Sequence, residues 1–132
     1  MRVMIALPRA LDDDVLRATG LSMTEYAVLM NLSEAENHEL RMTELAAATA
    51  LSASRITRVV EAMQSRGLVV KRRHPDDARG NVTTLTPEGF ERLRAAWPAH
   101  LASARERVVD QLDPASMAAL ARQFERVAEG LG

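Results

Sequence analysis

The amino-acid sequence predicts a mainly α-helical fold with one small β-hairpin, which is an α+β class. Two observations carry this prediction. Apolar residues recur at intervals of three and four in several parts of the chain, as in amphipathic helices. Residues 68–85 instead hold two short β-type runs around a turn-rich segment. The chain has 132 residues, of which 47% are hydrophobic, so it can form one globular domain with helical extensions.

Two helices are predicted at the N-terminus. The first covers about residues 7–17, and the acidic run 12–14 is expected on its solvated side. Gly20 ends this helix, because glycine adopts a left-handed backbone at little cost. Ser22 is a typical N-cap for the second helix. Its core-facing positions are Tyr26, Leu29 and Met30.

Two further short helices, joined by a tight turn, are predicted after a polar loop (33–39) and a brief strand (40–42). Thr43 is expected to cap the first of them, and alanines near the turn allow the pair to approach closely. Ser52 caps the second helix, and Gly67 ends it. Its predicted buried stripe is Ile56, Val59, Val60 and Met63.

The opposite side of this second helix carries polar and basic residues near its N-terminal end. They are Ser52, Ala53, Ser54, Arg55, Thr57 and Arg58. In helix-turn-helix proteins this end of the second helix enters the DNA major groove. The planar fork of arginine matches the two acceptors of guanine, and serine or threonine can contact phosphates or base edges. The pattern therefore predicts a DNA recognition helix.

A β-hairpin follows, with strands predicted over residues 68–73 and 82–85 and a turn-rich tip over residues 74–81. Arg79 is placed for the minor groove, whose negative potential attracts guanidinium groups, and Asp77 is expected to pair with it. The candidate DNA contacts of this wing are Arg72, Arg73, His74, Asp77 and Arg79. Together with the two helices, the hairpin makes a winged helix-turn-helix. Arg66 and Lys71 are interpreted as general surface charge.

The C-terminal part predicts two long helices. Thr86 followed by Pro87 is a typical helix start, and Asp113 followed by Pro114 repeats it. Pro98 is expected to kink or break the first of these helices. The predicted apolar stripes are Phe90, Leu93, Trp97, Leu101, Ala104, Val108 and Leu112 on the first helix, and Met117, Leu120, Phe124, Val127 and Leu131 on the second.

These stripes offer more apolar surface than the small motif can cover, so we expect a partner helix from a second copy of the chain. The sequence thus divides into a helical dimerisation region, residues 1–21 and 87–132, and a DNA-binding lobe, residues 22–86.

Charge is distributed unevenly along the chain. The formal net charge is −1, but residues 1–54 carry −4 and residues 55–80 carry +4, with seven Lys or Arg against three Asp or Glu. Affinity for phosphates depends on the local field, so the basic segment favours DNA despite the total.

Several motifs in order resemble the MarR (multiple antibiotic resistance regulator) family of bacterial transcription regulators. They are G-L-S-x-x-E-Y-x-V-L from residue 20, then M-T-E-L-A, L-S-x-S-x-I-T-R-x-V, R-G-L-V, D-x-R-G and L-T-P-E-G. The resemblance covers roughly the whole chain. The first helix is shorter than is usual in this family, with nineteen residues ahead of Gly20.

The resemblance implies a homodimer, joined by its N- and C-terminal helices, that binds a pseudo-palindromic operator and often a small phenolic or other lipophilic effector. It also implies that residues 52–58 begin the recognition helix and that Asp77 and Arg79 form the wing pair. We expect the regulator to be a repressor. The absence of cysteine excludes the peroxide-sensing subgroup, as well as disulfides and thiolate metal sites.

Three aromatic side chains, Tyr26, Trp97 and His100, could line an effector cavity, although aromatic residues on helical stripes more often belong to the core. His38 and His74, like His100, are interpreted as surface or core histidines, because none has the spacing of a metal site. No pattern of a nucleophile with a base, of paired carboxylates or of a phosphate loop is present, so neither enzyme activity nor a cofactor is expected.

Two other functions stay open. The winged helix could dock a protein instead of DNA, which the acidic first third makes conceivable. The chain could also bind a small molecule without any DNA activity.

The apolar run 3–7 is too short for a signal-peptide core, and no segment reaches the length of a membrane span, so we expect a cytoplasmic protein and no membrane partner.

Overall fold

The computed structural model describes residues 1–76 and 80–132. Its elements are α1 (Arg2–Thr19), α2 (Met23–Glu34), the 3-10 turn η1 (Glu36–His38), β1 (Glu39–Arg41), α3 (Met42–Thr49), α4 (Ala53–Ser65), β2 (Val69–Arg73), β3 (Asn81–Leu85), α5 (Pro87–Arg107), the 3-10 turn η2 (Val109–Gln111) and α6 (Pro114–Leu131). The predicted α+β class with a β-hairpin wing is confirmed. Among the described residues, no helix has the length and apolar character needed to span a membrane.

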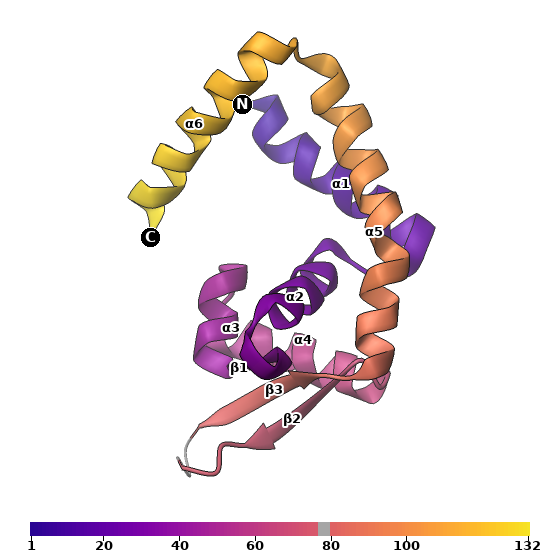
Figure 1. The fold of residues 1–132 in the computed structure, drawn as a ribbon, viewed down its shortest axis with the longest axis vertical. Helices are drawn as coiled ribbons and strands as arrows, with labels where there is room; N and C mark the ends of the chain where they lie inside the picture. The colour runs from indigo at the N-terminus through magenta and orange to yellow at the C-terminus, as the bar shows by residue number, and fades with distance from the viewer. Residues whose placement is uncertain (77–79) are drawn as a thin grey trace.

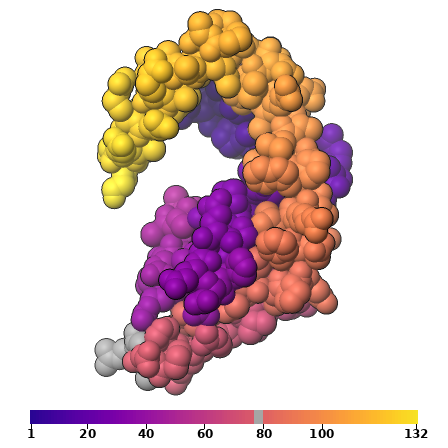
Figure 2. Space-filling model, viewed as in Figure 1, coloured from indigo at the N-terminus to yellow at the C-terminus, as the bar shows by residue number. Residues whose placement is uncertain are grey.

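The molecule has two parts (Figure 1). One end is a lobe made of α2, α3, α4 and the sheet. The other consists of α1, the far half of α5, and α6, which turns back toward the lobe without closing on it. The space-filling view shows an open hollow between α6 and the lobe (Figure 2).

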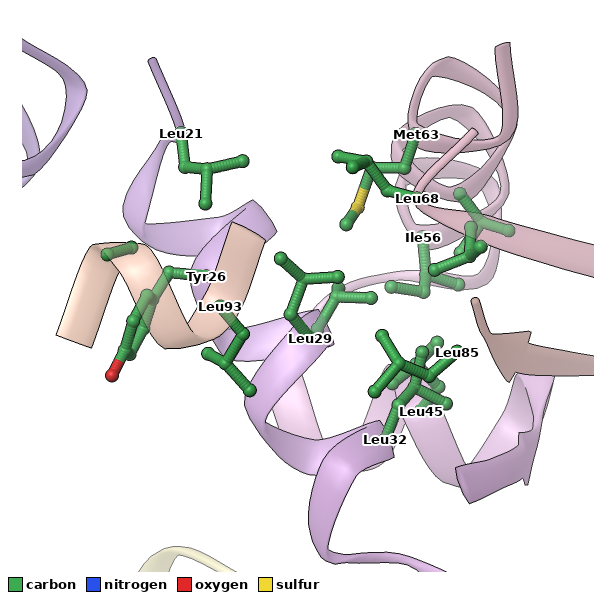
Figure 3. Packing of buried hydrophobic residues seen from close by; sticks show 14 residues of the cluster. Leu21, Tyr26, Leu29, Leu32, Leu45, Ile56, Met63, Leu68, Leu85 and Leu93 are labelled. Atoms are coloured by element: carbon green, nitrogen blue, oxygen red, sulfur yellow. The ribbon is translucent and has the colours of Figure 1, made fainter. Parts of the chain in front are cut away.

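One apolar cluster holds the lobe together and extends to the first turns of α5 (Figure 3). Its largest buried members are Leu21, Tyr26, Leu29, Leu32, Leu45, Ile56 and Met63. Because every helix of the lobe contributes to this cluster, the recognition-helix candidate α4 is held rigidly against α2 and α3.

The sheet has three antiparallel strands in the order β1-β3-β2. The central strand β3 pairs Thr84 with Glu39 of β1 and with Val70 of β2. Beyond the paired residues, the N–H of His74 donates to the carbonyl of Gly80, which continues the hairpin toward its tip. The predicted strands are confirmed, and the brief first strand lies one residue earlier than predicted.

Several predicted helix ends are confirmed by their caps. Ser22 and Glu25 form a capping box at the start of α2, with both hydrogen bonds at 3.0 Å. Thr86 accepts the N–H of Gly89 at the start of α5. Gly20, with φ of 74°, ends α1 in the left-handed region.

Other boundaries were predicted wrongly. Thr43 does not cap α3, because the helix already begins at Met42, where Glu44 accepts the N–H of Arg41. The loop predicted over residues 33–39 is largely the last turn of α2 and η1. Of the two outcomes predicted at Pro98, a break is excluded, because α5 is helical on both sides of it; a kink there stays a prediction.

Helix α1 is longer than predicted and its acidic run is not all solvated. It begins at Arg2 and passes through Pro8. Asp12 accepts the N–H of Met23 at 2.7 Å and so anchors α1 to the start of α2. Asp14 accepts from Ser103 and Arg107 of α5, 89 and 93 residues away. Asp12 and Asp14 are therefore less solvated than predicted, because they bond residues of other helices that the sequence does not reveal as partners.

The start of α5 passes very close to the start of β2. A Cβ atom on Gly89 would lie 2.0 Å from the carbonyl oxygen of Leu68, closer than any two such atoms can approach. Thr86 adds a hydrogen bond of 2.6 Å from its hydroxyl to the carbonyl of Gly67. This contact fixes where α5 leaves the wing.

We expect Gly89→Ala to lower the free energy of unfolding by more than about 2 kcal/mol, because the added methyl group must push α5 away from Leu68. Chemical denaturation would measure it. Gly130→Ala in α6 is the matched control, since a Cβ there meets nothing within 4 Å, and it should leave stability equal or slightly higher. Equal stability of the Gly89 variant would contradict the close approach.

The contact of Asp14 with Arg107 predicts a pH-dependent stability. Hydrogen bonds from Arg107 and Ser103 hold the pKa of the Asp14 carboxyl well below its usual range. The stabilisation is therefore complete above the ordinary carboxyl pKa and is lost as the pH falls toward the lowered one. We expect Asp14→Asn to lower the Tm at pH 7, with the difference narrowing below about pH 4.

Circular dichroism melts over a pH series, at one protein concentration, would measure this difference. Asp13→Asn is the control, because Asp13 is an exposed neighbour in the same helix. A Tm difference for Asp14→Asn that is as large at pH 3 as at pH 7 would show that the carboxylate charge does not carry the contact.

Candidate DNA-binding surface

Helix α4 is built so that one side is buried and the other is free. Its N-cap Ser52 accepts the N–H of Arg55 at 3.2 Å. Ile56, Val60 and Met63 are buried in the core of the lobe, as predicted. The chain leaves the helix after Arg66 at Gly67, whose φ of 76° is in the left-handed region. Burial of this stripe decides which side chains face outward.

The outward side of α4 presents most of the predicted recognition residues to solvent. The exposed ones are Ser52, Ala53, Ser54, Arg55 and Arg58. Arg55 and Arg58 border one shallow hollow, and within the described residues neither guanidinium is in an ion pair. Thr57 is half-buried, and its hydroxyl donates to the carbonyl of Ala53 at 2.8 Å, so it has only acceptor capacity to offer.

The predicted wing residues differ in their exposure to solvent and in their hydrogen-bond partners. Arg72 Nη2 donates to Glu39 Oε2 at 2.7 Å, so this guanidinium is shared with a carboxylate of β1. Arg73 is exposed. His74 is half-buried and its Nδ1 accepts the N–H of Asp76 at 3.1 Å. The last two predicted wing residues, Asp77 and Arg79, lie outside the described residues.

The interpretation of Arg66 and Lys71 as general surface charge was incomplete. Lys71 Nζ lies 3.1 Å from Glu61 Oε1 on α4, and the backbone N–H of Lys71 donates to the side chain of Gln64. Arg66 forms an ion pair with Glu25 of α2. Sequence reasoning missed these pairs because each joins two elements, although Glu61 and Lys71 are only ten residues apart.

Tyr26, Trp97 and His100 come together where α2 meets α5. The ring centroids of Tyr26 and His100 lie 4.5 Å apart, and those of Trp97 and His100 lie 6.4 Å apart. Tyr26 is buried, with its hydroxyl directed away from the apolar cluster (Figure 3). Trp97 is half-exposed and also lines a shallow groove of about 290 Å³ with Met30 and Phe90.

Two polar atoms of this aromatic group are buried, and within the part of the chain that the structure describes they have no hydrogen-bond partner. Among the described residues, neither the hydroxyl of Tyr26 nor Nδ1 of His100 has a hydrogen-bond partner. Burial raises the pKa of Tyr26 and lowers the pKa of His100, which keeps both rings neutral near pH 7. Buried polar atoms of this kind are suited to pairing with polar groups of a bound molecule.

Comparison with known proteins bears on both the sequence and the fold. A family model described as "MarR family" matches residues 19–80. Sco3205, a MarR family transcriptional regulator from Streptomyces coelicolor crystallised in complex with DNA, is 34% identical and superposes with a TM-score of 0.92, covering 99% of this chain and 82% of that one. The chain belongs to the MarR family.

Other relatives agree with this assignment. AbsC, another MarR family transcriptional regulator from Streptomyces coelicolor, is 36% identical with a TM-score of 0.89 over 98% of this MarR-family chain and 87% of that chain. The HTH-type transcriptional repressor YetL of Bacillus subtilis (strain 168) is 32% identical over 111 residues, 82% of this chain. The match spans 66% of the length of that repressor. All three named relatives are described as transcriptional regulators or repressors.

Proposed function

We propose that this MarR-family chain is a DNA-binding transcription regulator without enzyme activity. The observation that carries the proposal is the outward placement of Arg55 and Arg58 on the N-terminal half of α4, opposite the buried stripe. These two guanidinium groups, one turn apart and without an ion pair among the described residues, suit the O6 and N7 acceptors of guanine in the major groove. Ser52 and Ser54 at the helix start are suited to phosphate or base-edge contacts.

The wing would add contacts beside the recognition helix. Exposed Arg73 is suited to phosphate contacts, which fix position without reading sequence. His74 beside it stays a prediction from the sequence, because its Nδ1 already accepts from Asp76 and its Nε2 lies 3.4 Å from Arg41 Nη2. Arg72 divides its charge between Glu39 and any phosphate, so its contribution is expected to be smaller. The pairing of Asp77 with Arg79 and the minor-groove role of Arg79 stay predictions from the sequence.

Two copies of the chain would form the active unit. Among the exposed apolar side chains of the helical part, those that a partner would cover include Val3, Met4, Ile5, Leu101, Val109, Phe124, Val127 and Leu131. They support a homodimer joined through residues 1–21 and 87–132, with residues 22–86 as the DNA-binding lobe. Two recognition helices related by a two-fold axis fit a pseudo-palindromic operator with half-sites about one helical turn apart. The repressor name of the YetL relative supports repression as the outcome.

The group of Tyr26, Trp97 and His100 supports regulation by a small effector. Its buried hydroxyl and ring nitrogen could pair with a phenolic or carboxylic group, while the half-exposed Trp97 offers an aromatic face. An effector bound there would lie between the lobe and the dimerisation helices. If the effector binds more tightly to one arrangement of the lobe and the dimerisation helices, it changes the affinity for the operator. The coupling free energy between two such sites is typically about 1–3 kcal/mol.

The DNA proposal is tested by fluorescence anisotropy with duplex from the upstream region of the protein's own gene, at two salt concentrations, with scrambled duplex as reference. We expect Arg58→Ala to weaken specific binding by about 1–3 kcal/mol and to reduce selectivity over scrambled duplex. Arg73→Ala should weaken binding to both duplexes alike and lower the salt slope by about one.

Arg94→Ala is the matched control, because Arg94 is an exposed arginine on α5 with only a 3.7 Å pair to Glu91. Unchanged binding by folded Arg58→Ala would show that the assigned face of α4 does not contact DNA. Wild-type protein that prefers neither duplex at either salt concentration would favour the alternative of a winged helix that docks proteins, or a ligand-binding protein without DNA activity.

The effector site has an internal reporter, because Trp97 is the only tryptophan of the chain. With 2-hydroxybenzoate as the probe, we expect a saturable change in Trp97 fluorescence and a weaker operator complex. Tyr26→Phe should raise the apparent Kd of the probe, because it removes a buried hydroxyl that would bond the ligand. The same Kd for wild type and Tyr26→Phe would exclude this hydroxyl from the site.

A further inference from the structure

The turn between α1 and α2 is held by two arginines from distant parts of the chain. Arg92 of α5 donates through Nη2 to the carbonyl of Thr19 at 2.9 Å. Arg66 donates through Nη2 to the carbonyl of Gly20 at 3.3 Å and through Nη1 to the Glu25 carboxylate. The end of α4 and the middle of α5 are thus both hydrogen-bonded to the turn between α1 and α2.

Arg66 stands at the end of the recognition-helix candidate. It is the C-cap residue of α4, so its backbone moves with that helix. Its partner Glu25 also accepts the N–H of Ser22 in the capping box of α2, which fixes the position of the carboxylate. One side chain therefore connects the end of α4 with the point where the chain passes from α1 into the lobe.

Besides the bond of Asp12 to Met23, α5 also connects the two parts of the molecule. Leu93 and Ala96 pack into the core of the lobe, while Ser103 and Arg107 are bonded to Asp14 of α1. Pro98 lies between these segments and deprives the helix of one backbone hydrogen bond, which makes bending easier there. The angle between lobe and dimerisation helices is consequently not set by α5 alone.

We infer that Arg66 is a positioning residue for DNA recognition. By holding the Gly20 carbonyl and the Glu25 carboxylate at once, it fixes the angle at which the dimerisation helices carry α4. This inference rests on the proposed function as a dimeric DNA-binding regulator. In such a dimer, the angle at each α1–α2 turn sets the separation and the relative rotation of the two recognition helices.

The spacing between half-sites that the dimer prefers depends on that angle, so binding to duplexes of different spacing tests it. Inserting one base pair moves one half-site by about 3.4 Å along the duplex and rotates it by about 35°. A dimer with braced recognition helices tolerates such a change poorly, because both helices cannot enter their grooves together. A dimer that has lost the brace adapts at little cost, so it discriminates less between spacings.

The experiment compares wild type with Arg66→Met, which keeps the aliphatic stem and removes the donors. The duplexes are an operator selected from random sequence with the wild-type protein, and the same operator with one central base pair inserted or removed. We expect wild type to prefer its own spacing by at least about tenfold and Arg66→Met by less than about threefold. Affinity for an isolated half-site should not change.

Arg66→Lys keeps the charge opposite Glu25 and should restore part of the discrimination, while Arg94→Met is a control for loss of an exposed arginine. Glu25→Gln is a second route to the same loss, since an amide oxygen can still accept the N–H of Ser22. Glu25→Gln replaces Arg66→Met in the experiment if circular dichroism shows that Arg66→Met does not fold.

Affinities that fall in parallel for all three duplexes would indicate a merely structural role and would overturn the inference. A spacing profile identical to wild type would overturn it as well. Failure of the wild-type protein to select any duplex is distinguishable from both, because it would refute the proposed function and the inference that rests on it.

Discussion

Burial of one stripe of α4 is the constraint on which the candidate DNA-binding surface depends. Ile56, Val60 and Met63 can reach the core in one rotation of the helix only, since successive side chains are about 100° apart. That rotation places Arg55 and Arg58 outside. The following strand β2 is then tied to α4 through Glu61 and Lys71, so that the wing and helix form one rigid surface whose orientation the core decides.

Much of the fold could be predicted because it is specified by short-range signals. The caps Ser22, Ser52 and Thr86 each bond a backbone N–H three residues away, and such signals are visible in the sequence itself. The same holds for the buried stripe of α4 and for the hairpin. Interactions between distant segments could not be predicted. Asp14 was assigned to solvent, yet its partner Arg107 lies 93 residues further along the chain.

In the candidate site, too, features specified by local sequence were predicted, whereas contacts between distant segments were not. The exposed basic side of α4 followed from helical periodicity, whereas the pairing of Arg72 with Glu39 depends on a sheet order in which β3 lies between their strands. The meeting of Tyr26 and His100, 74 positions apart in the sequence, could be suspected only from their aromatic character. Arg66 looked like one surface charge among several, because nothing local marks a residue that bonds the carbonyl of Gly20.

The contact between α1 and α5 also has a consequence for the order of folding. Helix α1 is synthesised before the lobe, but Ser103 and Arg107, which donate to its Asp14, are made about 90 residues later. The lobe between them has its own apolar core and can form in the meantime. Closing so long a loop costs less conformational entropy once the intervening chain is compact. We therefore expect α1 to dock on α5 only after the lobe has formed.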